Sequence, residues 1–313
     1  MAGGLLRQLG HKNSGFGGVR LPPCTVRREI LIHRPRLGNV AQFRGLLGAA
    51  AGDLDPIAAA KARGADAIQF FLGDPQSWKS PECSYPEGAN ALRIAAEAAG
   101  IRLYVHAPYV INVATTNNKI RIPSRALLKK TALLAIECGA AGVIVHGGHV
   151  QEGDDPAIGF ENWGKALAQM ESPIPILIEN TAGGERAMAR HLDSISRLFE
   201  VATTYGAGFC LDTCHAHAGG LNMETLVSDI LKATGRIDLI HANGSRDEAG
   251  SGRDRHANLA PELSELNQLD VATVVEIIRQ ANSAAVVETP GDEFSQAADI
   301  AFLREQLGTS ESP

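Results

Sequence analysis

A chain of 313 residues, of which 44% are hydrophobic and 5% aromatic, can bury a large core and is typical of an Ala/Val/Ile/Leu-rich α/β protein rather than an all-β one. No apolar run approaches the roughly 18 residues that a bilayer crossing requires, so we expect a soluble protein with no membrane partner. The net charge of −6 does not exclude nucleic acid, because bound cations can supply the local positive charge that phosphates need.

Residues 1–45 are predicted to form an irregular basic extension. They carry eight Lys/Arg against the single Glu29, which leaves a balance of −13 for the rest of the chain. The segment is rich in Gly and Arg and has no sustained hydrophobic periodicity, so a mobile extension, an upstream start and a transit-type leader all fit it. It has no apolar core of the kind that a secretory signal requires. We expect it to contribute nothing to folding or to the active site.

From residue 46 the sequence alternates between short apolar runs and helical patterns, up to residue 308, after which 309–313 form a tail. The apolar runs are 45–51, 67–72, 103–106, 142–146, 176–179, 208–212, 239–241 and 285–288. The helical patterns are 56–63, 90–99, 124–138, 163–170, 194–203, 223–231, 271–280 and 294–306. Continuous apolar strands indicate a parallel sheet covered on both faces. Eight such units in one domain have the size of a (β/α)8 barrel, and a doubly wound sheet is the alternative, although no G-x-G-x-x-G turn is present.

The last six of these strands each end in a residue that can bind a metal. These residues are His106, His146, Glu179, Asp212, His241 and Glu288. In a barrel the carboxyl ends of the strands meet at one mouth, so residues far apart in the sequence come together there. Buried carboxylates without a cation would be costly. The pattern therefore predicts a metal cluster at the mouth of a barrel.

The segment 237–259 carries two further candidates. Asp254 and His256 are two residues apart, and in extended backbone such residues point to the same side. A carboxylate and an imidazole can then bind one metal ion, although on its own this segment fits a solvated polar loop equally well. The five cysteines, at positions 24, 83, 138, 210 and 214, form no C-x-x-C pair or disulfide framework, which indicates a reducing compartment such as the cytoplasm.

Six motifs, in order and spacing, resemble those of the endonuclease IV family over residues 46–307. They are Y-V-H-A-P-Y (104–109), V-I-V-H-G-G-H (143–149), I-E-N-T-A-G-G (178–184), C-L-D-T-C-H (210–215), R-D-R-H (253–256) and V-V-E-T (286–289). Members of this family are zinc-dependent apurinic/apyrimidinic endonucleases of base-excision repair, built on a (β/α)8 barrel. The resemblance implies the same fold and activity here.

The resemblance also implies three zinc ions, with manganese as an alternative at some sites. His106 and His146 would bind the first ion, and Glu179 would bridge it to the second. The second ion would be completed by Asp212, His241 and Glu288, and the third would be held by His215, Asp254 and His256. All nine ligands are His or carboxylate, which suits zinc or manganese and excludes a structural cysteine site.

The implied reaction cleaves the phosphodiester 5′ to an abasic site in double-stranded DNA and leaves a 3′-hydroxyl and a 5′-deoxyribose phosphate. Trimming of blocked 3′ ends is a second activity of the family. Two ions about 4 Å apart would activate water and neutralise charge on the phosphate, with Glu179 as the catalytic residue that fixes their spacing. Extrusion of the damaged nucleotide costs least where the base is missing. We expect a cytoplasmic, nucleoid-associated monomer.

Four residues are candidates for DNA contacts. Tyr109 matches the family's loop residue near the extruded nucleotide, and a simple rim aromatic is the alternative. Gln76 stands in F-L-G-D-P-Q-S-W (71–78) where many members have Arg in the loop that enters the minor groove. Arg253 and Arg255 are candidate phosphate contacts, although surface arginines can equally be solvated.

Two segments depart from the family's pattern. Members usually end the first strand with G-[AS]-H-V-S, whereas this chain has L-G-A-A-A-G (47–52) and lacks the His and Ser at positions 49–51. After R-D-R-H-A-N-L the family usually has a glycine-rich turn, but here A-P-E-L-S-E-L (260–266) follows. Neither change removes a ligand, so both are expected to affect DNA affinity more than chemistry.

Two other functions stay open from the sequence. Sugar isomerases and epimerases share this barrel and use one divalent metal, but they have no counterpart of the group His215, Asp254 and His256. A paralogue that binds DNA or metal without turnover is the non-enzymatic alternative, and the complete ligand set argues against it.

Overall fold

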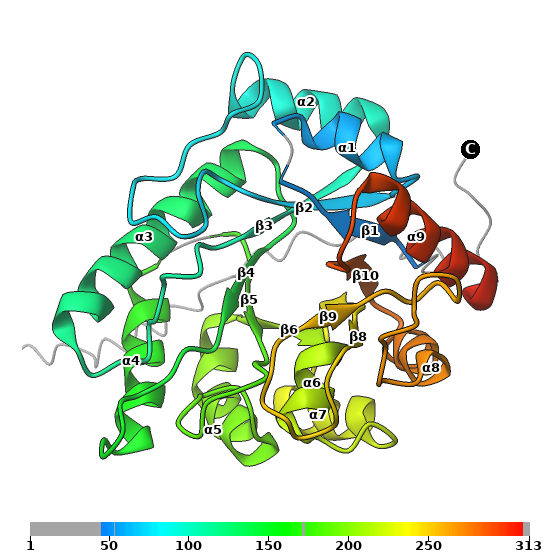
Figure 1. Ribbon diagram of the computed structural model, residues 1–313. Coiled ribbons are helices and arrows are strands. Elements are labelled where there is room, and N and C mark those ends of the chain that lie inside the picture. The colour runs from blue at the N-terminus through cyan, green and yellow to red at the C-terminus, as the bar shows by residue number, and fades with distance from the viewer. Residues whose placement is uncertain (1–44, 53, 171–172, 309–313) are drawn as a thin grey trace, which may run out of the picture. The chain divides into compact units, whose positions relative to one another are not determined.

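Eight parallel strands close into a barrel in the computed structural model, which describes residues 45–52, 54–170 and 173–308 (Figure 1). Around the barrel the strands follow the order β1-β10-β7-β6-β5-β4-β3-β2. Their bounds are β1 Leu47–Ala50, β2 Ala67–Phe71, β3 Arg102–His106, β4 Val143–His146, β5 Ile176–Glu179, β6 Gly208–Asp212, β7 Leu239–His241 and β10 Ala284–Val287. The predicted (β/α)8 barrel is therefore confirmed. Residues 1–44 and 309–313, which hold nearly all of the predicted extension and the tail, lie outside the described residues, and these domain boundaries stay predictions.

Helices surround the barrel and cover the outer faces of its strands (Figure 1). They are α1 Pro56–Ala62, α2 Ala89–Ala99, α3 Asn118–Glu137, α4 Pro156–Ala168, α5 Leu192–Ala202, α6 Thr213–Gly219, α7 Leu226–Thr234, α8 Val271–Ala281 and α9 Glu293–Leu307, with a 3-10 turn at Thr203–Tyr205. Aspartates begin several of them. The carboxylates of Asp55 and Asp155, for example, accept hydrogen bonds from the free backbone N–H groups of the first helical turn.

Two helices, α3 and α4, begin six and seven residues earlier than their sequence patterns predict. The helical pattern predicted one helix from residue 124. The structure begins α3 at Asn118, because the side chain of Asn117 accepts a hydrogen bond from the backbone N–H of Lys119 and caps the helix there. In α4 the proline itself is the first helical residue, since Pro156 needs no N–H partner at that position. The short helix α6 and the two-stranded sheet of β8 (Gly244–Ser245) and β9 (His256–Ala257) were not predicted.

The side chains inside the barrel form an apolar layer below a polar one. The apolar layer consists of Ala67, Tyr104, Ile144, Leu177, Cys210, Leu239, Ala284 and Val286. Successive side chains of a strand point to opposite faces, so the next inward position lies two residues further along. On seven strands that position carries a polar group, namely Gln69, His106, His146, Glu179, Asp212, His241 and Glu288. The fold thus gathers these groups at the carboxyl ends of the strands. Among the described helices, none combines the length and apolarity needed to cross a bilayer.

Candidate metal centre

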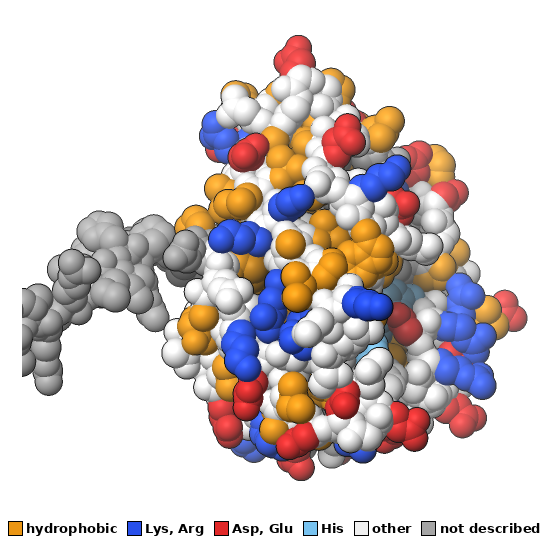
Figure 2. Space-filling view, turned by 90° about the vertical axis from the view of Figure 1, so that its left-hand side faces the viewer, with side chains coloured by type: hydrophobic (Ala, Val, Ile, Leu, Met, Phe, Trp, Pro, Cys, Tyr) orange, Lys and Arg blue, Asp and Glu red, His pale blue; other side chains and the backbone are white. Residues whose placement is uncertain are grey.

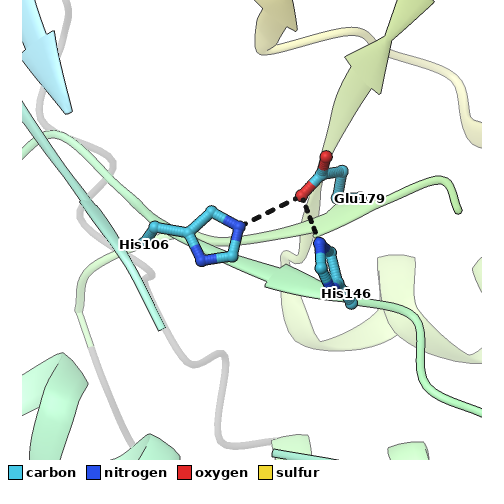
Figure 3. A group of neighbouring side chains, drawn as sticks. All are labelled: His106, His146 and Glu179. Carbon is cyan, nitrogen blue, oxygen red and sulfur yellow. Dashed lines mark hydrogen bonds and ion pairs between the residues drawn. The ribbon is translucent and has the colours of Figure 1, made fainter. Parts of the chain in front are cut away.

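Glu179 lies at the centre of the polar layer and is almost fully buried. Its Oε2 is 3.3 Å from Nε2 of His106 and 3.4 Å from Nε2 of His146, and Figure 3 shows the carboxylate directed at both rings. Its Oε1 is 3.0 Å from Nδ1 of His241 and 3.2 Å from Nδ1 of His215. Burial alone would raise the pKa of Glu179, but these histidines hold it well below its usual range. The carboxylate is therefore an anion shared by four imidazoles.

A second group is formed by residues from three neighbouring strands together with Glu179. Nδ1 of His241 lies 3.2 Å from Oε2 of Glu288 and 3.8 Å from Oδ2 of Asp212. The amide of Asn243 donates to Oδ2 of Asp212 at 2.7 Å, and its Oδ1 accepts from the backbone N–H of Glu288. One asparagine thus fixes two carboxylates that lie 76 residues apart in the sequence.

His215, Asp254 and His256 form a third group above the barrel. Nε2 of His215 is 3.2 Å from Oδ2 of Asp254, and Nε2 of His256 is 3.1 Å from Oδ1 of the same carboxylate. His215 is placed by the cap of α6, since its backbone N–H donates to Oδ1 of Asp212 at 2.6 Å. His256 is placed by β9, where Ser245 pairs with it in antiparallel register. Asp254 therefore faces both rings at once.

The loop that carries Asp254 is hydrogen-bonded to α6 and packs closely against the β5–α5 loop. Gly250 and Gly252 donate backbone hydrogen bonds to the carbonyl groups of His217 and Ala218 at 2.9 and 2.8 Å. Gly183 approaches this loop so closely that an added Cβ would lie 2.5 Å from the carbonyl oxygen of Gly252. Only glycine fits there, and the close approach holds the exposed carboxylate over the buried histidines.

In four histidines of the centre, one ring nitrogen is hydrogen-bonded to a carbonyl oxygen, and the other ring nitrogen faces the carboxylates. Nδ1 of His106 lies 2.7 Å from the backbone oxygen of Ala107. In the same way, Nδ1 of His215 lies 2.9 Å from the backbone oxygen of Asn180, and Nδ1 of His256 lies 3.1 Å from that of Glu288. For His241 the nitrogen is Nε2 and the acceptor is Oε1 of Gln69, at 2.8 Å. Once the ring is neutral, such an acceptor behind it favours the tautomer whose inward nitrogen has the lone pair that a metal requires.

The spacing of the inward atoms also fits metal ions. In a tetrahedral zinc site, bonds of 2.0–2.2 Å place neighbouring ligand atoms roughly 3.3–3.6 Å apart. The nitrogen–oxygen pairs described above within these groups lie 3.0–3.8 Å apart, and all the ligand atoms of each group lie within 4.8 Å of one another. Nε2 of His256 is buried and makes no well-oriented hydrogen bond, although Oδ1 of Asp254 lies 3.1 Å away, an arrangement that suits two ligands of one metal ion. The residues present therefore fit divalent metal ions.

The carboxylates determine which histidines are charged in the metal-free protein. Burial lowers the pKa of His146 to about 4, so this ring is neutral at pH 7. Burial also opposes the charged form of His256, but Asp254 and Asp212 outweigh it and raise its pKa to about 9. The same competition between burial and the Asp212 carboxylate raises the pKa of His215 well above its usual value.

Three amide side chains that were not predicted from the sequence make hydrogen bonds to the candidate ligands. They are Gln69, Asn180 and Asn243. Nε2 of Gln69 donates to Oε1 of Glu288 at 2.6 Å, while its Oε1 meets His241, so one amide joins two candidate ligands. Gln69 is buried within an otherwise apolar strand, and that was the only available signal. Asn180 and Asn243 each follow a strand-end residue, by one and two positions respectively. The amide of Asn243 donates to the carboxylate of Asp212, whereas the amide of Asn180 accepts from the backbone N–H of Asp212 and donates to its backbone oxygen.

The candidate DNA-contact residues differ in their exposure and in their partners within the protein. The ring of Tyr109 stacks on His146 with centroids 5.8 Å apart and is half exposed, so it lies directly beside the cluster. Gln76 is exposed, and its backbone N–H donates to Asp74. Arg253 and Arg255 are exposed but both pair with Asp247, which takes part of their hydrogen-bonding capacity. Their roles toward DNA stay predictions.

The first departure from the family pattern, at residues 47–52, affects the polar layer. Ala49 and Ala51 point outward into the core beneath the helices, whereas Ala50 packs against the apolar layer inside the barrel. Its partner in the parallel register is Gln69. β1 is therefore the one strand of the described barrel whose inward end carries no polar side chain.

The second departure, residues 260–266, follows β9. The backbone N–H of Ala260 donates to Oδ1 of Asp299 at 2.7 Å. Asn258, just before this segment, donates to the other oxygen of the same carboxylate at 2.9 Å. The beginning of the segment is thus hydrogen-bonded to α9, and it contains no glycine-rich turn.

The barrel and its cluster of His and carboxylate groups define a metal-dependent enzyme of the TIM-barrel class. The profile of the xylose isomerase-like TIM barrel family matches residues 57–306. A relative from Mycobacterium marinum named "Probable endonuclease 4" is 51% identical over 264 residues, covering 84% of this chain and all of the relative. The crystal structure of endonuclease IV from Thermus thermophilus superposes with a TM-score of 0.71 at 26% identity, covering 85% of this chain and 100% of that one. A D-tagatose 3-epimerase-like protein shares the fold at 16% identity and a TM-score of 0.68, covering 84% and 97%. The chain belongs to the endonuclease IV family, as its motifs predicted.

Proposed function

We propose that this member of the endonuclease IV family is a metal-dependent AP endonuclease, which cleaves the DNA phosphodiester 5′ to an abasic site and leaves a 3′-hydroxyl. One observation carries the proposal: nine His and carboxylate groups, from the ends of six barrel strands, from α6, from β9 and from the loop before β9, converge into three connected groups at one barrel mouth. A single-metal isomerase has no use for the third group. Double-stranded DNA with abasic sites is the substrate, and the protein acts as a cytoplasmic, nucleoid-associated monomer.

Three zinc ions fit these groups, with manganese as the alternative at some sites. His106 and His146 would hold the first ion, and Asp212, His241 and Glu288 would hold the second, with Glu179 between the two groups. His215, Asp254 and His256 would hold the third. When bound, zinc lowers the pKa of water and neutralises charge that develops on the phosphate and on the leaving oxygen.

The protein's own residues orient the substrate and exclude water. Tyr109 stands beside His146, and partial burial together with the Glu288 carboxylate raises its pKa to about 12, so its hydroxyl stays protonated and can donate to a phosphate or sugar oxygen. Glu179, held as an anion by its histidines, fixes the distance between the first two groups. Arg253 and Arg255 are placed on the rim to contact phosphates, and Gln76 to enter the minor groove.

The decisive experiment uses a duplex with one abasic-site analogue, without added magnesium and after brief exposure to EDTA. We expect a single cut 5′ to the analogue, because zinc held by buried ligands should survive the chelator. The matched duplex with thymine in place of the analogue should stay intact. A preparation that carries one metal per chain and cuts neither duplex would contradict the proposal and favour a sugar isomerase.

Gln69→Leu is expected to weaken zinc binding by roughly 10- to 100-fold, the usual effect of removing a group that orients metal ligands. The variant leaves His241 and Glu288 without their shared amide partner. Zinc affinity is measured by competition with a chromophoric chelator, and the melting temperature is recorded separately. The exposed Gln151→Leu is the control. Equal zinc affinities for Gln69→Leu and wild type would refute the orienting role.

Zinc binding at the third group is expected to release protons. At pH 7 His256 is protonated in the metal-free protein, because its pKa is raised to about 9, and the ring must lose that proton to bind a metal. Affinity should therefore rise by about tenfold per pH unit for each displaced proton and level off above pH 9. Calorimetry in buffers of different ionisation enthalpy counts the protons, and His256→Gln should release one fewer. An affinity that does not change between pH 6 and 8 would show that this ring is already neutral.

A further inference from the structure

One stretch of this acidic protein contains only basic charges. Residues 98–136 include no Asp or Glu, although the chain has 35 of them, and six Lys/Arg lie within the stretch. Five of the six are on α3, namely Lys119, Arg121, Arg125, Lys129 and Lys130. Figure 2 shows basic side chains among apolar ones on the face that contains this helix, next to a hollow in which histidines are visible. The charge is therefore concentrated on one side of the barrel.

The cations of α3 have no carboxylate partner among the residues that the structure describes. Nζ of Lys130 donates to the hydroxyl of Ser80 at 3.1 Å, and Nζ of Lys129 donates to the carbonyl of Gln169 at 3.1 Å. Arg125 donates to the carbonyl oxygen of Asn162. Neutral acceptors leave each positive charge uncompensated, so the surface is ready to receive an anion.

A groove of about 360 Å³ runs along this helix and is joined to the metal centre by Trp78. The groove is lined by Trp78, Ser80, Lys119 and Lys130 together with apolar residues of α3. A second groove of about 550 Å³ is also lined by Trp78 and extends to Tyr109 and His146. The indole is 47% exposed and belongs to both walls. A strand that leaves the metal centre can thus pass over Trp78 onto α3.

We propose that the α3 groove binds a single-stranded segment of DNA, with a base against the indole of Trp78 and phosphates beside Lys119 and Lys130. Aromatic rings that stack bases, set among cations that track the backbone, are the features of single-strand binding. Charge complementarity favours a polyanion, and the continuity with the metal centre favours the DNA over an acidic protein. The inference rests on the proposed function, and it extends the substrate class to DNA with a single-stranded flank.

The two tryptophans of the chain provide a direct test. Trp163 is fully buried and donates its Nε1–H to the carbonyl of Gly147 at 2.7 Å, so quenching of intrinsic fluorescence by an added oligonucleotide reports on the exposed Trp78. The probe is an eight-nucleotide oligothymidylate, added to the zinc-loaded full chain. We expect saturable quenching. The double variant Lys119→Glu/Lys130→Glu should bind at least about tenfold more weakly, and the slope of log K against log salt should shrink by about 1.4, that is, about 0.7 for each lost phosphate contact.

The matched control is Lys61→Glu/Lys232→Glu, which changes the net charge equally on α1 and α7. Equal affinity and equal salt slope in the two double variants would overturn the inference. A second contrary result would be an eight-base-pair duplex that binds more tightly than the single strand and whose salt slope shrinks by the same amount in Lys119→Glu/Lys130→Glu. Cleavage of a blunt abasic-site duplex should stay unchanged in Lys119→Glu/Lys130→Glu. If oligothymidylate binding fails while cleavage persists, only this inference is wrong. If the wild type binds oligothymidylate at α3 but cuts no abasic site, the proposed function is wrong instead.

Discussion

Glu179→Gln is expected to reduce cleavage of an abasic-site duplex by at least about a hundredfold, the scale of effects seen when a group that stabilises transition-state charge is removed. The substitution keeps the shape of the side chain but removes the negative charge that four imidazoles share at 3.0–3.4 Å. An amide offers one oxygen to the first two metal groups instead of two. Binding of the duplex should change little, because the proposed phosphate and groove contacts lie on the rim. The measurements are single-turnover cleavage and binding of the same duplex.

Two further variants separate chemistry from folding. Glu185→Gln makes the same chemical change six residues away on an exposed side chain that pairs with Arg190, and it should keep full activity. Glu179→Asp keeps the charge on a shorter stem and should retain more zinc than Glu179→Gln. Zinc content and melting temperature are recorded for each, since a buried imidazolium that loses its anion destabilises the fold. If Glu179→Gln keeps more than a tenth of wild-type turnover, Glu179 does not bridge the two groups.

The barrel was predictable because each of its strands is short, apolar and followed by a helical pattern. The convergence of the strand-end residues follows from the same topology, since parallel strands of a closed barrel carry their carboxyl ends to one mouth. His106 and Glu288 are 182 residues apart in the sequence, yet the fold brings both into the polar layer. The strand endings therefore predicted where these residues lie. Their roles as ligands were inferred from residue type and family resemblance.

Contacts that depend on side-chain direction in three dimensions were not predictable. Gln69 is one polar residue inside an apolar strand, and nothing in the sequence says that its amide faces the barrel interior and joins His241 to Glu288. The pairing of Arg253 and Arg255 with Asp247 arises from the turn between β8 and β9, a short sheet that the sequence did not indicate. The sequence left both arginines as phosphate contacts or solvated surface charges, whereas the fold gives them a carboxylate partner.

His256→Ala is expected to remove about one metal ion from a wild-type content of about three, and to lower abasic-site cleavage by orders of magnitude. Nε2 of His256 is buried without a well-oriented hydrogen bond and points at Asp254, so its loss opens the third group while the first two stay intact. Nδ1 of the same ring meets the backbone oxygen of Glu288, and this contact is lost as well. Metal content is measured by mass spectrometry on protein dialysed against chelator, beside a cleavage assay. His191→Ala, an exposed histidine at the beginning of α5, should change neither quantity.

The same variant discriminates the nuclease from an isomerase on this barrel. An isomerase moves a proton or hydride around one metal and the substrate hydroxyls, so it would keep its turnover without the third group. A phosphodiesterase must stabilise the negative charge on its leaving oxygen, and the group His215, Asp254 and His256 lies where a further cation can do so. Asp254 reaches this position only because Gly183 and Gly252 let the loop approach so closely. Full cleavage by His256→Ala with unchanged metal content would leave the third group without a function. Loss of about one ion together with cleavage would tie it to the departure of the 3′-oxygen.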